Sequence, residues 1–313
     1  MSAPAVVTVI LNWNNAQRSI ESAQSVMRAY AHAADELSDA TLVIVDNGSD
    51  AADFRELQSW SRGGHGQGVR LVANPENLGY AAGMNAGIRE AVTESTSYVW
   101  LLNNDTEVAV DALSAMLLFS AQHPCAMIVG STIIDPQKQV TWSAGGYRYL
   151  RWFGYGKPLG TGLAPSEVCA VPEPKPDYVD GAAIWLRGEF LRRMGGVPER
   201  HFLYFEELEL NRYLAAGETV GWCRNALVTH EGAASVSTTL GLRRATYHAA
   251  LSAFEYTARV HPWCLPTVML SRVFGIAVRS ARTLQPGLLW AVFRAGWVLV
   301  ARSGRDSPGS EPG

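Results

Sequence analysis

The stretch Val43-Ile-Val-Asp-Asn-Gly-Ser-Asp50 sets three branched apolar residues directly before a carboxylate and a turn. This pattern predicts a buried strand that ends abruptly. Further short apolar runs alternate with helical stretches on both sides of it, which is typical of an α/β fold with a mostly parallel central sheet flanked by helices. The strand-like runs cover residues 6–11, 41–45, 69–72, 98–102 and 127–134, and the helical candidates include residues 15–34 and 81–93.

The polar residues directly after these strands are the first candidates for a binding site. Asn12, Asp46 and Asp105 each follow a strand, and open α/β sheets bind ligands in the crevice beyond the carboxyl ends of their strands. A carboxylate such as that of Asp46 can accept a hydrogen bond from the imide N–H of uracil or thymine. The alternative is that Asp46 caps the next helix or shapes the turn.

Composition narrows the class of protein. The chain has 313 residues, of which 48% are hydrophobic and 18% charged, and these values exclude wholesale disorder. A net charge of −3 gives no global attraction to nucleic acid. The start of the chain lacks the basic segment and cleavage site of a signal peptide, so we expect a cytoplasmic protein. The widely spaced cysteines are expected to be reduced thiols and not zinc ligands, and they are Cys125, Cys169, Cys223 and Cys264.

The second half of the chain is less regular. Residues 145–176 are rich in glycine, proline and aromatic residues, which predicts a long loop or an irregular hairpin over the sheet. Regular structure is expected to resume at residues 178–186. Helices near residues 188–194 and 206–216 and a strand that ends at His230 are expected to follow.

The C-terminal segment differs in kind. Residues 256–303 contain six arginines and no acidic residue, so this span carries +6 and the remainder −9, which together give −3. Because the arginines interrupt the apolar runs, we do not expect a transmembrane helix. We expect basic amphipathic helices over residues 241–305 that lie on an anionic membrane surface, followed by a disordered end at residues 306–313. The alternative is that these helices pack on the core or, around Trp290 and Trp297, on a second copy in a homodimer.

A glycine-rich helix is predicted within Asn74-Pro-Glu-Asn-Leu-Gly-Tyr-Ala-Ala-Gly-Met-Asn-Ala-Gly87. Its glycines recur every four residues and form one smooth helix face that can approach the sheet or a ligand closely. The spacing differs from that of a dinucleotide-binding GxGxxG motif and of a Walker loop. Close packing alone would explain the glycines, but it would not explain Asn77 and Asn85 beside them.

Two further segments carry side chains suited to chemistry. In Leu101-Leu-Asn-Asn-Asp-Thr106, Asp105 and the amide of Asn103 suit Mg²⁺ or Mn²⁺ shared with a diphosphate, because hard cations take oxygen ligands. A helix cap at Asp105 is the alternative. His230 is a candidate metal or phosphate ligand, or else a structural histidine.

The other segment, His201-Phe-Leu-Tyr-Phe-Glu-Glu207, places aromatic residues before two carboxylates. Apolar surroundings raise the pKa of a carboxyl group and make it a better base near neutral pH. Acidic residues in the first turn of a helix also complement the helix dipole, which is the structural alternative.

Together and in this order, these segments resemble the inverting family 2 glycosyltransferases, whose catalytic domain has the GT-A (Rossmann-like) fold. The resemblance covers about residues 5–240 and rests on Thr8-Val-Ile-Leu-Asn-Trp-Asn14, Val45-Asp-Asn-Gly-Ser49, Asn77-Leu-Gly-Tyr-Ala-Ala-Gly-Met-Asn-Ala-Gly87, Leu101-Leu-Asn-Asn-Asp-Thr106 and Phe202-Leu-Tyr-Phe-Glu-Glu207. With His230-Glu-Gly-Ala-Ala-Ser235, the segments look most like the rhamnosyltransferase-type branch that builds bacterial cell-surface polysaccharides. The resemblance implies a catalytic domain over residues 1–240, with nucleotide-sugar binding in about 1–135 and the acceptor side in about 136–240.

The resemblance also implies roles for single residues. Glu207 stands at the family's base position, with Glu206 as the second candidate. Asp105 would hold a divalent metal, Mg²⁺ or Mn²⁺, on the donor diphosphate, with Asn103 at the first position of the family's DxD element. The nucleotide-binding candidates are Asn12, Asp46, Asn77, Gly79, Asn85 and Asn104. The sugar and acceptor candidates are Asp180 and Gly181, with Trp142 and Trp185 as stacking platforms.

The reaction implied is a single displacement that inverts the anomeric carbon. The donor expected from the resemblance is dTDP-rhamnose, and the acceptor is a glycan or a polyprenyl-diphosphate-linked sugar at the inner face of the cytoplasmic membrane. UDP-galactofuranose or a UDP-hexose is the alternative donor. A sugar-nucleotide-binding scaffold without catalysis is the alternative of a different class.

Overall fold

The computed structural model describes residues 3–168, 175–232, 241–283, 285 and 287–303, and these form two compact units. The first unit comprises the described residues of Met1–Arg148, Lys157–Phe202 and Glu206–Ser235. The second comprises those of Tyr149–Gly156, Leu203–Phe205 and Val236–Gly313. Cys169, residues 233–235 of the His230 motif and the expected disordered end at residues 306–313 lie outside the described residues.

The expected alternation of strands and helices is present, and every element expected before residue 135 has its ends within two residues of the expected ones. The strands are β1 (Ala5–Asn12), β2 (Asp39–Asn47), β3 (Arg70–Asn74), β4 (Thr96–Asn103), β5 (Thr106–Val108), β6 (Ala126–Asp135), β7 (Val140–Ala144), β8 (Gly146–Leu150), β9 (Tyr155–Pro158), β10 (Tyr178–Val179), β11 (Ala183–Arg187) and β12 (Thr219–His230). The helices are α1 (Ala16–His32), α2 (Ala51–Arg62), α3 (Tyr80–Ala91), α4 (Ala112–Gln122), α5 (Pro165–Val168), α6 (Gly188–Met194), α7 (Glu206–Asn211), α9 (Leu242–Val260), α10 (Leu265–Thr283) and α11 (Gly287–Ser303).

The helix expected over residues 206–216 ends at Asn211. The amides of Arg212 and Tyr213 bond to the carbonyl groups three residues before them, at 3.0 and 3.1 Å, so the chain leaves the helix through tight turns.

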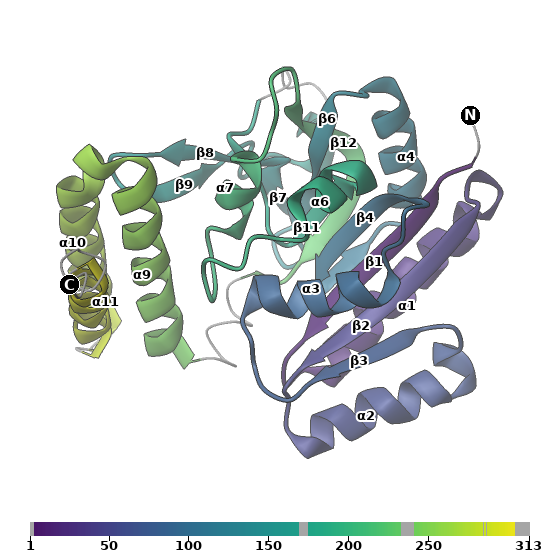
Figure 1. Ribbon diagram of the computed structural model, residues 1–313, viewed down its shortest axis with the longest axis horizontal. Coiled ribbons are helices and arrows are strands. Elements are labelled where there is room, and N and C mark those ends of the chain that lie inside the picture. Colours follow the sequence, from purple (N-terminus) through teal and green to yellow (C-terminus); the bar gives the residue numbers. More distant parts are fainter. Residues whose placement is uncertain (1–2, 169–174, 233–240, 284, 286, 304–313) are drawn as a thin grey trace, which may run out of the picture. The chain divides into compact units, whose positions relative to one another are not determined.

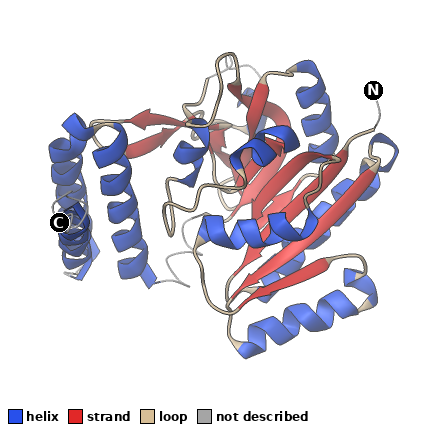
Figure 2. Cartoon of the chain, in the orientation of Figure 1, coloured by secondary structure: helices blue, strands red, loops and turns tan. Residues whose placement is uncertain are grey.

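Nine of the described strands form one central sheet, in the order β3-β2-β1-β4-β11-β6-β12-β5 with β7 beside β6 (Figures 1 and 2). The strands β3, β2, β1 and β4 are parallel, as expected. Beyond β4 the sheet is mixed, because β11 runs antiparallel to both β4 and β6. The chain places β2 and β3 on one side of β1 and then returns to β4 on the other. This reversal creates a crevice at the carboxyl ends of β1 and β4, where such sheets bind ligands.

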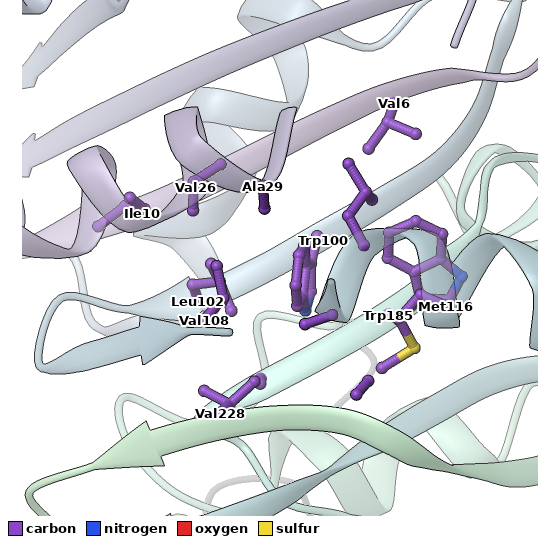
Figure 3. Packing of buried hydrophobic residues seen from close by; sticks show 14 of the residues in the cluster. Val6, Ile10, Val26, Ala29, Trp100, Leu102, Val108, Met116, Trp185 and Val228 are labelled. Atoms are coloured by element: carbon purple, nitrogen blue, oxygen red, sulfur yellow. The ribbon is translucent and has the colours of Figure 1, made fainter. Parts of the chain in front are cut away.

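Alternate residues of β1 face opposite sides of the sheet. Ile10 packs in a cluster with Val26 of α1, whereas Val9 packs in a second cluster with Met84 of α3. Figure 3 shows the first cluster around Trp100. Because helices cover both faces, the strand is apolar except for Thr8 and Asn12 and does not alternate between polar and apolar residues.

The glycine face of α3 packs on this sheet. A Cβ at Gly83 would lie 2.5 Å from Leu11 Cδ1, and one at Gly87 would lie 2.6 Å from Val9 Cγ1. Larger residues would push the helix off the strands, so packing explains these two glycines.

Residues 145–176 include a hairpin, which was one of the two expected alternatives. β8 pairs with β9 on one side and with β10 on the other. Tyr147 of β8 stands opposite Tyr178 of β10, and their rings stack with centroids 5.2 Å apart. The pairing of β8 with β10 therefore places Tyr147, near the start of this segment, beside Tyr178, just after its end.

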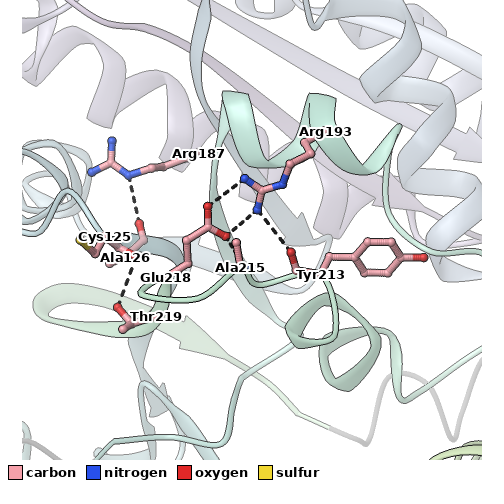
Figure 4. A network of polar contacts seen from close by, with 8 residues as sticks. All are labelled: Cys125, Ala126, Arg187, Arg193, Tyr213, Ala215, Glu218 and Thr219. Atoms are coloured by element: carbon pink, nitrogen blue, oxygen red, sulfur yellow. Dashed lines mark hydrogen bonds and ion pairs between the residues drawn. The ribbon is translucent and has the colours of Figure 1, made fainter.

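An arginine clamp fixes the turn that leads into β12 (Figure 4). Arg193 at the end of α6 donates to Glu218 Oε1 at 2.8 Å and to the carbonyl oxygen of Tyr213 at 3.3 Å. The N–H of Ala215 donates to Glu218 Oε2 at 2.8 Å. The charge pair is exposed and contributes little stability by itself. It anchors the start of the strand that ends at His230.

The second unit contains α9, α10 and α11, which pack on one another and form the expected helical C-terminal extension. Large apolar side chains remain exposed on it, namely Trp263, Leu270, Phe274, Val278, Trp290, Phe293, Trp297 and Val300. Contrary to expectation, one helical stretch among the described residues, Pro262–Thr283, is long and apolar enough to cross a membrane. A single stretch of this kind, judged by length and composition alone, is weak support for a span.

Candidate active site

Asn12 joins the ends of β1 and β2. It stands opposite Asp46 in the parallel register, and its Nδ2 donates to Asp46 Oδ1 at 2.9 Å. The same amide donates to Asp53 Oδ2 at 2.8 Å, and its Oδ1 accepts from Ser19 Oγ at 2.7 Å. Asn12 is fully buried, and Asp46 is 3% exposed. One amide therefore holds two carboxylates at the crevice. Asp53 was not among the residues expected here.

The turn after β2 depends on two aspartates. Asp46 Oδ2 accepts from the N–H of Ser49 at 3.2 Å and so shapes the turn, as one alternative held. The helix cap is supplied by Asp50, whose side chain accepts from two amides of α2. The capping alternative for Asp46 is therefore wrong.

Asn47 and Asn77 fix the loop before α3. Asn47 Nδ2 donates to Asn77 Oδ1 and to the carbonyl oxygen of Gly79, both at 3.1 Å. Gly79 has a φ of 87°, and a Cβ there would lie 2.4 Å from the carbonyl oxygen of Phe202. That carbonyl accepts from the N–H of Tyr80 at 2.9 Å. The loop is thereby held against the segment before α7. Sequence reasoning missed Asn47, although it belongs to the same strand end as Asp46.

Asp105 and His230 meet where β5 pairs with β12. Thr106 stands opposite His230 in the antiparallel register, and His230 Nε2 lies 3.2 Å from Asp105 Oδ1. Burial lowers the pKa of His230, but the hydrogen bond with Asp105 and the negative charges of Asp105, Asp180 and Glu231 outweigh it and raise the pKa above its usual value. The element after Asp105 is a strand, so the helix-cap alternative for Asp105 is wrong.

Asp105 and His230 fit a divalent ion that takes its remaining ligands from phosphate and water. Within the described residues, no group of three or more His, Cys, Asp or Glu side chains could hold an ion alone. Asp105 and His230 offer one oxygen and one nitrogen donor, and Asn103 ends strand β4 two residues before Asp105. Mg²⁺ and Mn²⁺ commonly take their remaining ligands from phosphate and water.

Glu207 lies against the backbone of Gly181. A Cβ at Gly181 would lie 1.9 Å from Glu207 Oε1, so only glycine permits this approach. Burial, supported by the charge of Asp180, raises the pKa of Glu207 to about 7, although a backbone hydrogen bond and the charge of His201 act to lower it. The segment that follows Gly181 is joined to the end of β4, because the N–H of Asn103 donates to the carbonyl oxygen of Ala182 at 3.0 Å. A carboxylate with a pKa near neutrality thus stands next to the crevice.

Asp180 is a buried carboxylate with three donors. Its Oδ2 accepts from Ser143 Oγ at 2.7 Å and from the hydroxyl of Tyr147 at 2.9 Å, and its Oδ1 accepts from the N–H of Ala182 at 3.0 Å. Trp142 Nε1 donates to the hydroxyl of Tyr147 at 3.0 Å, and the Trp142 side chain is exposed. The structure therefore brings Trp142, Asp180 and Gly181 into one hydrogen-bonded wall.

The first turn of α7 holds two further buried acids. Glu206 is 2% exposed, and its Oε1 has no hydrogen-bond partner among the described residues. Burial and the charge of Glu207 raise the pKa of Glu206 well above its usual value. Glu209 Oε1 lies 3.2 Å from Nε2 of His201, and this buried contact ties α7 to the segment before it.

Three expected residues have contacts that compete with their expected roles. Trp185 is fully buried in the core between Tyr98 and Trp100, so the expectation that it stacks on a sugar is wrong. Asn85 Nδ2 donates to the carbonyl oxygen of Val197 at 2.8 Å, and its Oδ1 accepts from the N–H of the same residue. Its nucleotide contact stays a prediction. So does that of Asn104, whose side-chain amide makes, within the described part of the chain, only long contacts of 3.5 Å with residues 12 and 15.

Comparison with known proteins agrees with the geometry. A model of the family "Glycosyl transferase family 2" matches residues 5–168. The N-acetylglucosaminyl-diphospho-decaprenol L-rhamnosyltransferase of Mycobacterium tuberculosis is 25% identical over 228 residues, which are 66% of this chain and 72% of that protein.

Two solved structures have a similar fold. The mannosyltransferase PcManGT from Pyrobaculum calidifontis, in complex with GDP-Man and Mn²⁺, matches with a TM-score of 0.55 and 16% identity over 99% of this chain and 89% of that one. GalNAc-T7 with UDP, GalNAc and Mn²⁺ matches with a TM-score of 0.54 and 16% identity over 81% of this chain and 51% of that one. The expected GT-A fold is thereby confirmed.

Proposed function

The chain belongs to glycosyl transferase family 2, and from this premise we propose that it transfers L-rhamnose from dTDP-rhamnose onto a polyprenyl-diphosphate-linked sugar. Members of this family are nucleotide-sugar-dependent inverting glycosyltransferases. The observation that carries the proposal is the contact of Glu207 with Gly181, at the wall of the crevice where β1 and β4 end. The choice of rhamnose and of a lipid-linked acceptor is supported by the name of the mycobacterial relative.

In this proposal the reaction is a single displacement. Glu207 accepts the proton of an acceptor hydroxyl, whose oxygen attacks the anomeric carbon of the donor from the face opposite the leaving diphosphate. Asp105 and His230, together with Asn103, would hold a divalent ion on the diphosphate of the donor. A divalent ion bound there supplies positive charge that stabilises the leaving diphosphate. Asp46, held by Asn12, accepts the imide N–H of the thymine base.

Two alternatives to this function can be tested by experiment, a different donor and a protein that binds the donor without catalysis. Uracil presents the same imide N–H as thymine, so UDP-galactofuranose or a UDP-hexose fits the same account of Asp46. A scaffold that binds a sugar nucleotide without transferring it would share the whole donor side of the site. Transfer by the wild type that is lost in a variant of the base separates the enzyme from the scaffold.

A thermal-shift experiment tests the donor side. We expect dTDP-rhamnose with Mn²⁺ to raise the Tm by about 5 to 10 °C at a concentration of about 100 times its Kd, because a ligand that binds only the folded state stabilises it. The panel includes UDP-hexoses, dTDP and UDP, each with and without Mn²⁺. Asp105→Ala should abolish the metal-dependent part of the shift.

The matched control is Asp111→Ala, which makes the same change at an exposed aspartate of the same unit. A metal-dependent shift with a UDP-sugar instead of dTDP-rhamnose would replace the donor in the proposal. No shift with any nucleotide in the presence of Mn²⁺ would contradict the donor site as a whole.

The second unit supplies the membrane contact in this proposal. Its exposed aromatic residues are accompanied by arginines that lie over aromatic rings. Arg294 lies 5.2 Å from the ring centroid of Tyr247 and 5.9 Å from that of Trp290, and Arg243 lies 5.1 Å from the latter. Apolar rings beside basic groups suit the interface of an anionic bilayer. The proposed location is therefore the cytoplasmic face of the membrane, with the protein attached peripherally.

Binding to vesicles tests this contact. We expect the chain to sediment with phosphatidylglycerol vesicles at low salt, and we expect the double variant Phe274→Ser/Trp297→Ser to bind at least about tenfold more weakly, because each aromatic side chain gains about 1.5–3 kcal/mol when it is fully buried. The control is Leu118→Ser, which changes an exposed leucine of α4 in the first unit.

Other outcomes separate the remaining interpretations. The protein could instead stay in solution with these vesicles as a dimer, and Trp297→Ser could dissociate that dimer. This result would show that the exposed aromatic residues contact a second copy of the chain and not the membrane. If the protein remains in the membrane fraction after an alkaline carbonate wash and is extracted only by detergent, the Pro262–Thr283 stretch spans the bilayer.

A further inference from the structure

Trp142 is an exposed tryptophan with a fixed orientation. It lies on β7, its side chain is 39% exposed, and its Nε1 donates to the hydroxyl of Tyr147 at 3.0 Å. Because the polar atom of the indole is already bonded, the exposed part of the ring is an apolar surface. A flat apolar surface of this kind suits the C–H face of a pyranose ring, whose hydroxyl groups project at its edge.

Tyr147 is held from two sides. Its ring stacks on Tyr178 with an interplanar angle of 10°, and its hydroxyl donates to Asp180 Oδ2 at 2.9 Å. Burial and the charge of Asp180 raise the pKa of Tyr147 well above its usual value, against the hydrogen bond from Trp142, so the hydroxyl keeps its proton. The same hydroxyl therefore accepts from the indole and donates to the carboxylate.

Asp180 connects Tyr147 to the backbone beside Glu207, the proposed base. Its Oδ1 accepts from the N–H of Ala182, so the hydrogen bond closes a turn around Gly181. The carbonyl oxygen of Gly181 accepts from the hydroxyl of Tyr80 at 3.0 Å, which holds the peptide from another side. Glu207 lies against Gly181. Trp142 is thus connected to the neighbourhood of the base through Tyr147, Asp180 and Gly181.

We propose that Tyr147 is a positioning residue of an acceptor-sugar subsite, in which a pyranose ring stacks on Trp142 and the Tyr147 hydroxyl keeps that indole aligned with the Asp180–Gly181 wall beside Glu207. This inference rests on the proposed function and names the class of ligand that its acceptor side takes, a pyranoside. The sugar of a lipid-linked acceptor would present the same ring.

The experiment uses methyl pyranosides, so it depends neither on the donor nor on the lipid. Binding of the methyl glycosides of N-acetylglucosamine, glucose and galactose to the full chain is measured by saturation-transfer NMR, with dTDP or UDP and Mg²⁺ present. Trp142→Ala is expected to weaken binding of the preferred glycoside by about tenfold or more, because it removes the stacking surface. Tyr147→Phe keeps the stack on Tyr178 but removes both hydrogen bonds, and about three- to tenfold weaker binding is expected.

Two comparisons separate positioning from a general loss of structure. In the Trp142→Ala background, Tyr147→Phe should cause no further loss, because it acts through the indole. Trp142→Phe, which keeps a ring but no N–H, should lose about as much as Tyr147→Phe. Tyr155→Phe is the matched control, because Tyr155 is an exposed tyrosine of the same hairpin, with no hydrogen bond from its hydroxyl among the described residues. It should bind like the wild type.

Three results would overturn the proposal. They are a wild type that binds none of the three glycosides, a Trp142→Ala variant that binds as the wild type does, and additive losses in the double variant. The nucleotide thermal shift, measured on the same samples, reports on the proposed function separately. If that shift is intact while glycoside binding is absent, only the acceptor subsite fails.

Discussion

Glu207→Gln is expected to lower kcat for sugar transfer by about 10²- to 10⁴-fold and to leave donor binding in place. Glutamine has nearly the same shape as glutamate and fits beside Gly181, but it cannot take the proton of the acceptor hydroxyl. The measurement is the initial rate of transfer to a synthetic polyprenyl-diphosphate-linked N-acetylglucosamine. Donor binding is followed by thermal shift in the same preparation, so that loss of catalysis is distinguished from loss of the site.

Glu206→Gln is the matched control. Glu206 is 2% exposed, and its burial and the charge of Glu207 raise its pKa well above the usual value, so a neutral amide resembles the protonated acid that these surroundings favour. We expect the rate of this variant to stay within about tenfold of the wild type. The opposite pattern, with Glu206→Gln inactive and Glu207→Gln active, would move the base to Glu206. Donor binding without transfer in the wild type would favour the scaffold.

The pH dependence follows from the same carboxyl group. Glu207 must be ionised to act as a base, and burial raises its pKa to about 7, so the rate should fall about tenfold per pH unit below that value. The stability of the fold should change in the opposite sense. Between the ordinary pKa of 4.5 and about 7, the folded state binds more protons at Glu207 than the unfolded state, so the contribution of this group to the unfolding free energy falls as the pH rises. Glu207→Gln should remove that part of the pH dependence.

Much of the donor side could be predicted from local sequence. Apolar runs that end in polar residues identify strands, and the alternation of strands with helices makes neighbouring strands parallel. Parallel strands bring their carboxyl ends to one edge, which is why Asn12 and Asp46 proved to be register partners and Asn103 stands opposite Leu11.

The acceptor side depends on contacts between residues far apart in sequence, and these were not predictable. The hydrogen bond of Tyr147 to Asp180 spans 33 residues, and that of Ser143 to Asp180 spans 37. Both require a turn or hairpin whose path no local pattern specifies. The contact of Glu207 with Gly181 was equally hidden, because a glycine that leaves room for a side chain looks the same in sequence as a glycine in a turn.

Trp142 and Trp185 were both expected to stack on sugar, but the sequence does not show which of them is exposed. Because Trp185 is buried, Trp185→Ala should have one of the largest effects on stability. The side chain of Trp185 is fully buried, stacks on Tyr98 at 5.0 Å, meets the edge of Trp100 at 5.7 Å, and donates through Nε1 to Ser120 Oγ at 3.0 Å. Its removal leaves a cavity and an unpaired hydroxyl. We therefore expect a loss of about 3–5 kcal/mol in the free energy of unfolding, measured by urea denaturation followed by circular dichroism.

Trp142→Ala is the control for Trp185→Ala, because it deletes the same side chain from an exposed position. The side chain of Trp142 makes one hydrogen bond among the described residues and is 39% exposed, so we expect a loss of only about 1 kcal/mol. Strand pairing explains the contrast, because β11 lies between β4 and β6 in the centre of the sheet, whereas β7 pairs with β6 off the main strand order. Equal losses for the two variants would contradict this assignment of Trp185 to the core and of Trp142 to the surface.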